Sequence, residues 1–194
     1  MYKEIINHIE EIISLDESEI DRFTSILVRK KLRKRQFLIQ EDEYVKYQYF
    51  VAKGCLKAYE VDKNGDEHII QFAIENWWIS DFKAFYEKGK ANLNIDCVEE
   101  SIVYGIAKQD LEKLFLDIPK FDRFFRIKLT FAYVALQNRI LSSLDKSNTE
   151  RYQEFQKTYP DLEQRVPNYM IANYLGIKPE SLSRIRRNLT KKKS

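Results

Sequence analysis

The sequence predicts an α+β fold in which a small antiparallel β-barrel or sandwich precedes one long helix and a C-terminal helix-turn-helix. Three observations support this prediction. Short strand-like segments cluster between residues 36 and 107, a helical stretch rich in apolar residues runs from about 118 to 144, and two short helices meet at Gly176. A chain of 194 residues is long enough for one full domain and a small second one.

Composition excludes several classes of function. Only five glycines occur, and the sequence has neither a GxGxxG nor a GxxxxGK[ST] phosphate loop. Two cysteines (Cys55 and Cys97) and two histidines (His8 and His68) cannot by themselves form an iron–sulfur cluster, a structural zinc site or a histidine-based triad. We therefore expect no cofactor, no metal and no enzymatic activity.

The expected compartment is a reducing cytoplasm. The sequence shows no signal peptide, and the two cysteines lie far apart, which indicates free buried thiols. No apolar run approaches the roughly 18 residues that a membrane span needs.

The N-terminal part is expected to be helical to about Val28, with a second helix that starts at the acidic segment Asp16–Glu19. A basic run, Arg29–Arg35, then precedes the strand-like segment Gln36–Gln40. Such a run is compatible with a nucleic-acid patch or with a solvated strand edge, and its position favours the edge. Further strands are expected at 47–52, 56–61, 67–72, 94–98 and 101–107, with an Asn64-Gly65 hairpin turn.

The long helix is apolar on two sides, whereas a surface helix needs only one apolar face. We therefore predict that one face packs on the β domain and the other on a second copy of the chain; a core helix in a monomer is the alternative. One stripe has a 3-4-3-4 repeat that includes an Asn, as in a coiled-coil seam whose Asn sets the register. This predicted dimer interface consists of Phe124, Ile127, Phe131, Val134, Asn138 and Leu141. The other stripe consists of Phe125, Leu129, Ala132, Leu136, Ile140 and Leu144.

The segment Asn168–Arg187 predicts the helix-turn-helix. Gly176 can adopt the left-handed conformation that ends a first helix, and Pro179 suits the first position of a second. Apolar residues at helical spacing would lock the two helices together: Ile171, Ala172, Leu175, Leu182 and Ile185. The remaining face of the second helix is basic with one carboxylate, as is common for a helix in the DNA major groove. The residues predicted to contact DNA are Lys178, Glu180, Ser181, Ser183, Arg184, Arg186 and Arg187.

Charge is unevenly distributed. The whole chain has a net charge of +3, yet seven basic residues and only one acidic residue, Glu180, occur from Lys178 onward. The rest of the chain is therefore slightly acidic, which localises contact with a polyanion to the C-terminus. The tail Lys191–Lys193 is compatible with a solvated segment or with an additional DNA contact.

This order of elements resembles the Crp/Fnr superfamily of bacterial transcription regulators. The resemblance covers nearly the whole chain and is carried by Tyr49–Gly54, Lys57–Tyr59, the Asn64-Gly65 hairpin, Asp110–Leu114 and Ile171–Arg187. It implies a cyclic-nucleotide-binding-like β-roll with N-terminal helices over 1–117, a dimerisation helix and hinge over 118–146, and a DNA-binding domain over 147–194. It also implies a homodimer that reads a near-palindromic operator. The implied partners are double-stranded DNA, a second copy of the chain, RNA polymerase as a candidate, and an effector of unknown identity.

The resemblance also implies roles for single residues. Pro179–Arg184 is similar to the family's Arg-Glu-Thr-hydrophobic-small-Arg recognition segment. By that match Glu180 accepts from a cytosine amino group, Arg184 contacts guanine or a phosphate, and Ser181 contacts the backbone. Pro179 stands where the family has its leading Arg, so we expect a different operator.

The β-roll departs from the family's cyclic AMP cassette, which has Gly-Glu and, about ten residues later, Arg-Ser. The segment Trp78–Phe82 is similar to its first part, with Asp81 in place of the ribose-binding Glu. No arginine occurs from Gln36 to Asp122, so a buried phosphodiester would lack a guanidinium partner. We therefore predict that cyclic AMP does not control the protein.

Another ligand could occupy the β-roll. Its candidate pocket residues are Trp78, Asp81, Leu136 and Gln137. The cysteine cluster of the family's oxygen-sensing branch is also missing. The alternative function is a ligand- or partner-binding β-roll with a vestigial helix-turn-helix.

Overall fold

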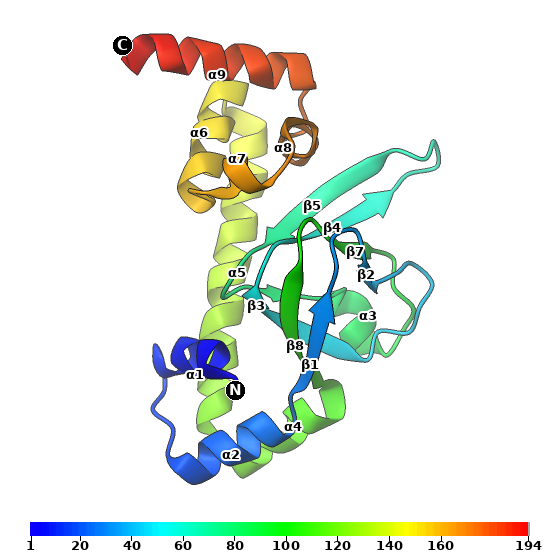
Figure 1. Ribbon diagram of the computed structural model, residues 1–194, viewed down its shortest axis with the longest axis vertical. Helices are drawn as coiled ribbons and strands as arrows, with labels where there is room; N and C mark the ends of the chain where they lie inside the picture. The colour runs from blue at the N-terminus through cyan, green and yellow to red at the C-terminus, as the bar shows by residue number, and fades with distance from the viewer. Residues whose placement is uncertain (194) are drawn as a thin grey trace.

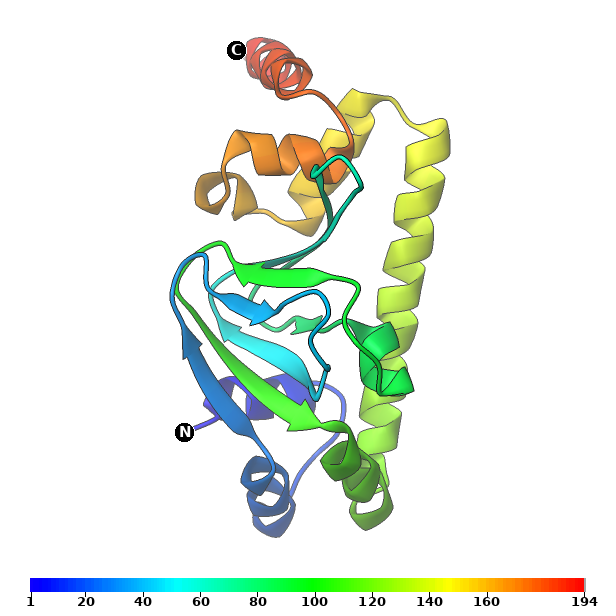
Figure 2. The same cartoon turned by 90° about the vertical axis from the view of Figure 1, so that its right-hand side faces the viewer.

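The computed structural model describes residues 1–193, in which a β-roll and a C-terminal helical domain lie side by side along one long helix (Figures 1 and 2). The helices are α1 (Lys3–Glu10), α2 (Glu17–Ser25), α3 (Phe82–Glu87), α4 (Lys108–Asp117), α5 (Lys120–Asp145), α6 (Asn148–Thr158), α7 (Leu162–Arg165), α8 (Asn168–Leu175) and α9 (Pro179–Lys193). The strands are β1 (Val28–Leu32), β2 (Phe37–Ile39), β3 (Tyr47–Lys53), β4 (Leu56–Val61), β5 (Glu67–Ala73), β6 (Trp78–Ile79), β7 (Asn94–Cys97) and β8 (Ser101–Ala107). Within these residues, no helix combines the length and apolar character that a membrane crossing requires.

The β-roll consists of two four-stranded antiparallel sheets, in the orders β1-β8-β3-β6 and β2-β7-β4-β5. Alternate residues from both sheets meet in a core that includes Tyr49, Val51, Leu56, Ile95 and Val103. The Asn64-Gly65 turn joins β4 to β5 as predicted, with Gly65 at φ +87° and its N–H donating to the Asp62 carbonyl at 2.9 Å. The predicted antiparallel barrel or sandwich is therefore confirmed.

The basic run forms a strand that the pattern did not predict. Residues Val28–Leu32 make β1, which pairs with β8 alone and is an edge of its sheet. Arg29, Lys30 and Lys31 put cations on both faces of this strand, so no alternation of apolar and polar residues marks it in the sequence. The predicted strand edge is therefore present for Arg29–Leu32, whereas Arg33–Arg35 lie in the turn that follows it.

The N-terminal helices close the outer face of the β1-β8-β3-β6 sheet. Asp16 and Glu19 form a capping box that starts α2, as the acidic segment indicated. Together with α4 and the first turns of α5, these helices bury a second core that includes Ile9, Phe23, Phe50 and Phe121. This core fixes the lower end of α5 to the β-roll.

The buried and exposed faces of the long helix α5 differ from the prediction. Phe124, assigned above to the dimer interface, is 0% exposed in the core of the single chain, so it is unavailable to a partner. Phe125 packs on the β-roll side, but the rest of the second stripe is exposed rather than packed on the β domain. The exposed large apolar residues of α5 are Leu129, Phe131, Tyr133, Val134, Leu136, Ile140, Leu141 and Leu144. Both apolar stripes are therefore open over the upper half of the helix.

Candidate nucleic-acid interface

The segment α8–turn–α9 has the geometry that the spacing predicted. Gly176 ends α8 at φ +63°, and the Ile177 N–H donates to the Ala172 carbonyl at 2.9 Å. Leu182 and Ile185 on α9 are buried in one cluster with the apolar face of α8 and with aromatic residues of α6. The helix-turn-helix is thus held by the apolar anchors that the sequence indicated.

Most of the predicted DNA-facing residues lie free on α9, the outermost element at the end of the molecule away from α1 and α2 (Figure 1). Ser181 is half-buried. Four charged residues of the predicted set are exposed: Lys178, Glu180, Arg184 and Arg187. Within the described residues, none of these four charged side chains forms an ion pair. The predicted tail, Lys191–Lys193, belongs to α9, but the side chains of its last two lysines and all of Ser194 lie outside the described residues.

Arg186 does not belong to this face, which corrects the prediction. Its guanidinium donates to the Tyr152 hydroxyl at 2.9 Å and to the Glu163 carboxylate at 2.5 and 3.0 Å. Burial disfavours the charged guanidinium, but the hydrogen bonds to Glu163 and Tyr152 outweigh it, so the pKa of Arg186 is raised. Arg186 therefore ties α9 to α6 and α7 and is not available to DNA.

Ser183 is also partly occupied. It is exposed, but its hydroxyl donates to the Pro179 carbonyl at 3.0 Å and accepts from the Asn168 amide at 3.3 Å. These bonds connect the first turn of α9 to the start of α8. Ser183 therefore has less hydrogen-bonding capacity for DNA than the prediction assumed.

Two polar residues that the sequence did not single out attach the helix-turn-helix to the β-roll. Asn173 on α8 accepts from the Ile69 N–H at 2.7 Å and donates to the Glu67 carbonyl at 2.6 Å, so its amide pairs with the edge strand β5. Arg165 on α7 binds both Glu75, at 2.9 and 3.0 Å, and Glu99. No sequence signal marks these pairs, because their members lie from 66 to 106 residues apart.

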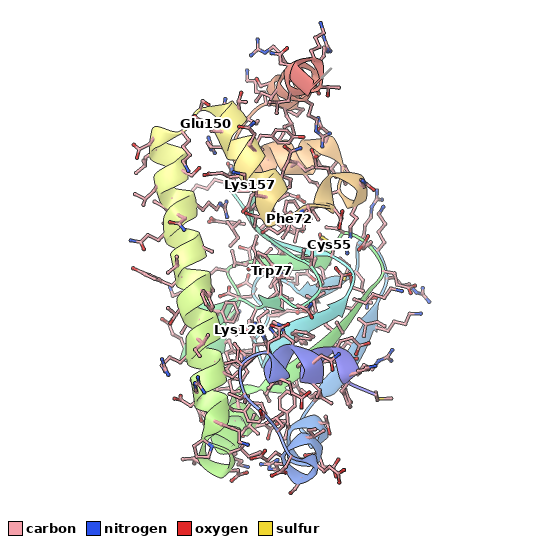
Figure 3. All side chains as sticks on the ribbon, turned by 90° about the vertical axis from the view of Figure 1, so that its left-hand side faces the viewer. Cys55, Phe72, Trp77, Lys128, Glu150 and Lys157 are labelled. Atoms are coloured by element: carbon pink, nitrogen blue, oxygen red, sulfur yellow. The ribbon has the colours of Figure 1, made fainter. Side chains whose placement is uncertain are left out.

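Aromatic side chains fill the space between the two domains. Tyr159 stacks on Trp77 with ring centroids 5.2 Å apart, and its hydroxyl donates to the Phe72 carbonyl at 3.2 Å. Phe72, Trp77 and Cys55 lie in this layer between the β-roll and the C-terminal helices (Figure 3). Phe72 and Trp77 thus serve the packing between the two domains.

The four predicted pocket residues do not line one pocket. Trp78 packs between Phe50 and Phe125, at ring distances of 5.5 and 5.1 Å. Leu136 is 54% exposed and Gln137 is also exposed, both on the upper half of α5. Two surface hollows lie elsewhere, one around Ile185 and one around Tyr104.

Asp81 is buried and already fully engaged. Its carboxylate accepts from the backbone N–H groups of Ala84, Asn92 and Leu93 at 3.0, 2.8 and 3.2 Å. It therefore caps α3 and holds the segment before β7, instead of offering a free acceptor to a sugar hydroxyl.

The two cysteines are buried thiols. Burial raises the pKa of Cys55 to about 12 and that of Cys97 to about 11, so both stay protonated and weakly nucleophilic. In residues 1–193 no three His, Cys, Asp or Glu side chains are grouped as a metal site would require.

Known proteins share both the sequence pattern and the fold. The family described as cyclic nucleotide-binding domain matches residues 29–117. The fumarate and nitrate reduction regulatory protein of Vibrio cholerae is 27% identical over 184 residues, which is 89% of this chain and 73% of that protein. The Escherichia coli K12 protein of the same name is 26% identical over 186 residues, again 89% and 73%.

Solved structures agree in fold. FixK2 from Bradyrhizobium japonicum aligns with a TM-score of 0.74 at 19% identity, over 86% of each chain. The c-di-GMP-responsive global regulator CLP from Xanthomonas campestris aligns with a TM-score of 0.70 at 16% identity, over 91% of this chain and 93% of that one. The order of β-roll, long helix and C-terminal helices is common to them.

Proposed function

The chain belongs to the Crp/Fnr family of transcription regulators, and on that premise we propose that it is a homodimer that reads a specific DNA operator without control by cyclic AMP. Regulators of this family bind DNA as dimers and are not enzymes. The operator, the dimer seam and the independence from cyclic AMP are the parts that we propose for this chain.

The observation that carries the proposal is the free reading face of α9. Its apolar side is anchored on α8 by Leu182 and Ile185, while Glu180 and Arg184 point away from the core without an ion pair in the described part of the chain. Unpaired Arg and Glu side chains on such a helix can reach guanine and cytosine edges in the major groove. Lys178 and Arg187 supply phosphate contacts on the same exposed surface.

The exposed apolar side chains along α5 support the proposal that the protein dimerises through this helix. Exposed large apolar side chains occur along its last four turns, from Leu129 to Leu144. A surface of this kind is unusual on a monomer and typical of an interface. We propose a seam formed by Ile127, Phe131, Val134, Asn138 and Leu141, with Leu136 now added from the second stripe.

The hydrogen bonds of Asp81 support the proposal that cyclic AMP does not control the protein. Three backbone N–H groups converge on its carboxylate, so the chain itself supplies the anion at this place. No arginine is available between Gln36 and Asp122 to compensate a phosphodiester.

One binding experiment tests the proposal. A duplex selected by the full-length protein from a random-sequence library serves as the probe in fluorescence anisotropy. Arg184→Ala should weaken binding of the selected duplex at least about tenfold, as expected for loss of a base-contacting guanidinium. The matched control is Arg123→Ala, an exposed arginine near the start of α5, which should bind as the unaltered protein does.

The same assay separates the alternatives. Addition of cyclic AMP should leave the affinity unchanged. Selection that yields no preferred sequence, together with equal binding by Arg184→Ala, would support a β-roll module with a vestigial helix-turn-helix instead. A strong gain of affinity with cyclic AMP would contradict the effector part of the proposal alone.

A further inference from the structure

The N-terminal hollow, the surface recess around Tyr104, is separate from the reading face of α9. It measures roughly 460 Å³, within the range of about 300 to 1,000 Å³ that is usual for small-molecule sites. The start of the chain, β1 and β8 contribute its lining, which includes Tyr2, Lys3, Glu4, Arg29, Ile102 and Tyr104. The N-terminus lies on the side of the β-roll away from α5, so pairing of α5 with a second copy would leave this hollow accessible (Figure 2).

The N-terminal helices cover only part of the sheet face that forms the floor of the hollow. Along the outer face of β8, exposure increases from Ile106, which is 0% exposed, through Tyr104 at 4% to the half-buried Ile102. On the neighbouring strand β1, Arg29 lies opposite Tyr104 in the pairing register and is exposed. Apolar and cationic side chains therefore meet where the helical cover of this sheet ends.

Tyr2 forms an aromatic wall of the hollow. Its ring stands edge-on to that of Tyr104, with centroids 4.9 Å apart and an interplanar angle of 72°. Its backbone is left-handed at φ +69°, a conformation that a bulky side chain rarely adopts. Tyr2 is half-buried, so part of this ring remains open to a ligand. The hollow thus offers a flat apolar surface next to the aliphatic side chain of Ile102.

The charges in the lining favour a ligand with one negative charge. Neither Lys3 nor Arg29 forms an ion pair or a side-chain hydrogen bond within residues 1–193. Glu4 also lines the hollow, and its carboxylate accepts from the Tyr104 hydroxyl at 3.1 Å. Burial and the contact with Glu4 raise the pKa of Tyr104 to about 12, so this hydroxyl remains a donor. Two unpaired cations beside one carboxylate can compensate a monoanion, whereas a dianion would be repelled by Glu4.

We propose that the N-terminal hollow binds a small aromatic monocarboxylate. The Arg29 guanidinium holds the carboxylate through two parallel N–H donors, and Lys3 adds a second positive charge. The ring of the ligand packs against Tyr2 and Ile102. This site goes beyond the proposed function, because it requires no DNA and uses no residue of α9.

Protection of the strand edge does not account for this arrangement. Charge on β1 discourages pairing with another chain, and Lys30 and Lys31 already provide it next to Arg29. A protective charge also needs no aromatic wall and no guanidinium fork. Arg29→Lys separates the two roles, since it keeps the charge on the edge but loses the bidentate geometry.

The experiment titrates the full-length ¹⁵N-labelled protein with four small probes and follows its amide resonances by NMR. Benzoate and indole-3-acetate carry both a ring and a carboxylate. Benzyl alcohol has the ring without the charge, and acetate has the charge without the ring. The titration gives the affinity of each probe, and the amides whose resonances shift identify where it binds.

The two aromatic carboxylates should shift the amide resonances of Arg29 and Ile102. They should bind at least about tenfold more tightly than benzyl alcohol or acetate, because each of these lacks one of the two recognised groups. Equal affinity for benzyl alcohol, or shifts that avoid Arg29 and Ile102, would overturn the proposal. Absence of binding by both aromatic carboxylates would also overturn it.

Variants of the cation test the salt bridge. Arg29→Gln should weaken benzoate binding at least about tenfold, and Arg29→Lys should weaken it about threefold or more. The matched control is Arg33→Gln, an exposed arginine in the turn after β1, which should bind benzoate as the unaltered protein does. Equal benzoate affinity in Arg29→Gln and the unaltered protein would contradict the role of the guanidinium.

Variants of Tyr2 test the aromatic wall. Tyr2→Ala should weaken benzoate binding about fivefold or more, whereas Tyr2→Phe should keep it, because the ring and not the hydroxyl makes the contact. Equal weakening by both changes would contradict this contact. Binding of the selected DNA duplex is measured separately on the same proteins and shows that each variant is folded. Failure of the benzoate site would leave the proposed function of α9 intact.

Discussion

Two buried polar residues, Asp81 and His8, differ in how their polar atoms are satisfied. The Asp81 carboxylate accepts hydrogen bonds from three backbone N–H groups, so both of its oxygens have partners. Neither ring nitrogen of His8 forms a well-aligned hydrogen bond in the described residues, although Nδ1 lies 3.5 Å from a Glu11 carboxylate oxygen. Phe50 and Phe124 pack against the ring at centroid distances of 5.2 and 5.8 Å. Burial and, to a lesser degree, the nearby Lys128 lower the pKa of His8 to about 4, whereas Glu11 opposes the shift.

His8 should make the fold sensitive to acid. Its pKa is lower in the folded chain than in the unfolded chain, where it is about 6.5. The unfolded state therefore binds the proton first, and stability falls as the pH falls from about 6.5 toward 4. Over that window the loss should approach about 3 kcal/mol.

Urea unfolding measured from pH 7 to pH 4.5 checks this expectation. His8→Phe should show a shallower decline than the unaltered protein, because the variant has no proton to gain at this position. His68→Phe is the control, since His68 is exposed and hydrogen-bonded to Asp62 at 3.0 Å. Identical slopes for His8→Phe and the unaltered protein would contradict the assignment.

At the scale of elements, the edge of β5 is covered by a side chain of α8 and not by a further strand. This strand is an edge of its sheet, and the Asn173 amide supplies one donor and one acceptor to it, as a neighbouring peptide group would. Arg165 on α7 adds a second attachment to the β-roll, through Glu75 and Glu99 in the segments after β5 and β7. Hydrogen bonds to both carboxylates raise its pKa although burial opposes its charge, so Arg165 stays charged at any physiological pH. The orientation of the reading helix thus depends on a few polar contacts between the domains.

Asn173→Ala should loosen this docking. The Ile69 N–H and the Glu67 carbonyl would each lose a partner in a partly buried place, at a cost of about 1 to 3 kcal/mol. Hydrogen exchange at the Ile69 amide should become faster, and thermal unfolding should begin at a lower temperature. Asn188→Ala, on the exposed side of α9, should change neither. Unchanged protection of Ile69 in Asn173→Ala would show that other contacts hold the domains.

At the scale of the whole molecule, one helix serves two sets of contacts. The lower turns of α5 belong to the core beneath the β-roll, while the upper turns expose apolar residues on both stripes. Because the helix is continuous, pairing through its upper half would place a partner's α5 at a fixed position relative to the β-roll and the C-terminal domain. Pairing through the upper half would therefore set the separation of the two α9 helices, which an operator with fixed half-site spacing requires.

Phe131→Glu should convert the dimer into a monomer. Phe131 is 67% exposed in the single chain, so the change should leave the fold of one chain intact and place a charge in the proposed seam. Sedimentation velocity should show a monomer at concentrations where the unaltered protein is dimeric, and affinity for the selected duplex should fall at least tenfold with loss of the second half-site. Leu116→Glu, on α4 and 82% exposed, is the matched control and should stay dimeric. A dimeric Phe131→Glu protein would exclude this seam.

Periodicity and turn chemistry made much of the fold predictable. Gly176, Pro179 and the apolar anchors of α8 and α9 fixed the helix-turn-helix, and the Asn64-Gly65 pair fixed the β4–β5 turn. The acidic segment Asp16–Glu19 marked the start of α2, where the structure has a capping box. These signals are local: each depends on residues within one turn or one helix, so the sequence contains all of the information.

Burial and long-range partners were decided only by tertiary structure. The same apolar pattern runs through Phe124 and Phe131, but Phe124 is buried and packs against His8 of α1, whereas Phe131 is exposed. Arg186 looks like its neighbours on α9 until Glu163 and Tyr152 approach it from other helices. Trp78, Asp81, Leu136 and Gln137 were grouped by resemblance, yet packing separates them.

By itself, the sequence thus determined the α+β class, the order of elements, the turn at Gly176 and the free residues Glu180 and Arg184. Tertiary structure decided which cations are paired, which face of α5 is open and how the C-terminal domain sits on β5. The physical reason is range. Backbone preference and side-chain periodicity act between near neighbours, whereas burial and ion pairing depend on residues that only folding brings together.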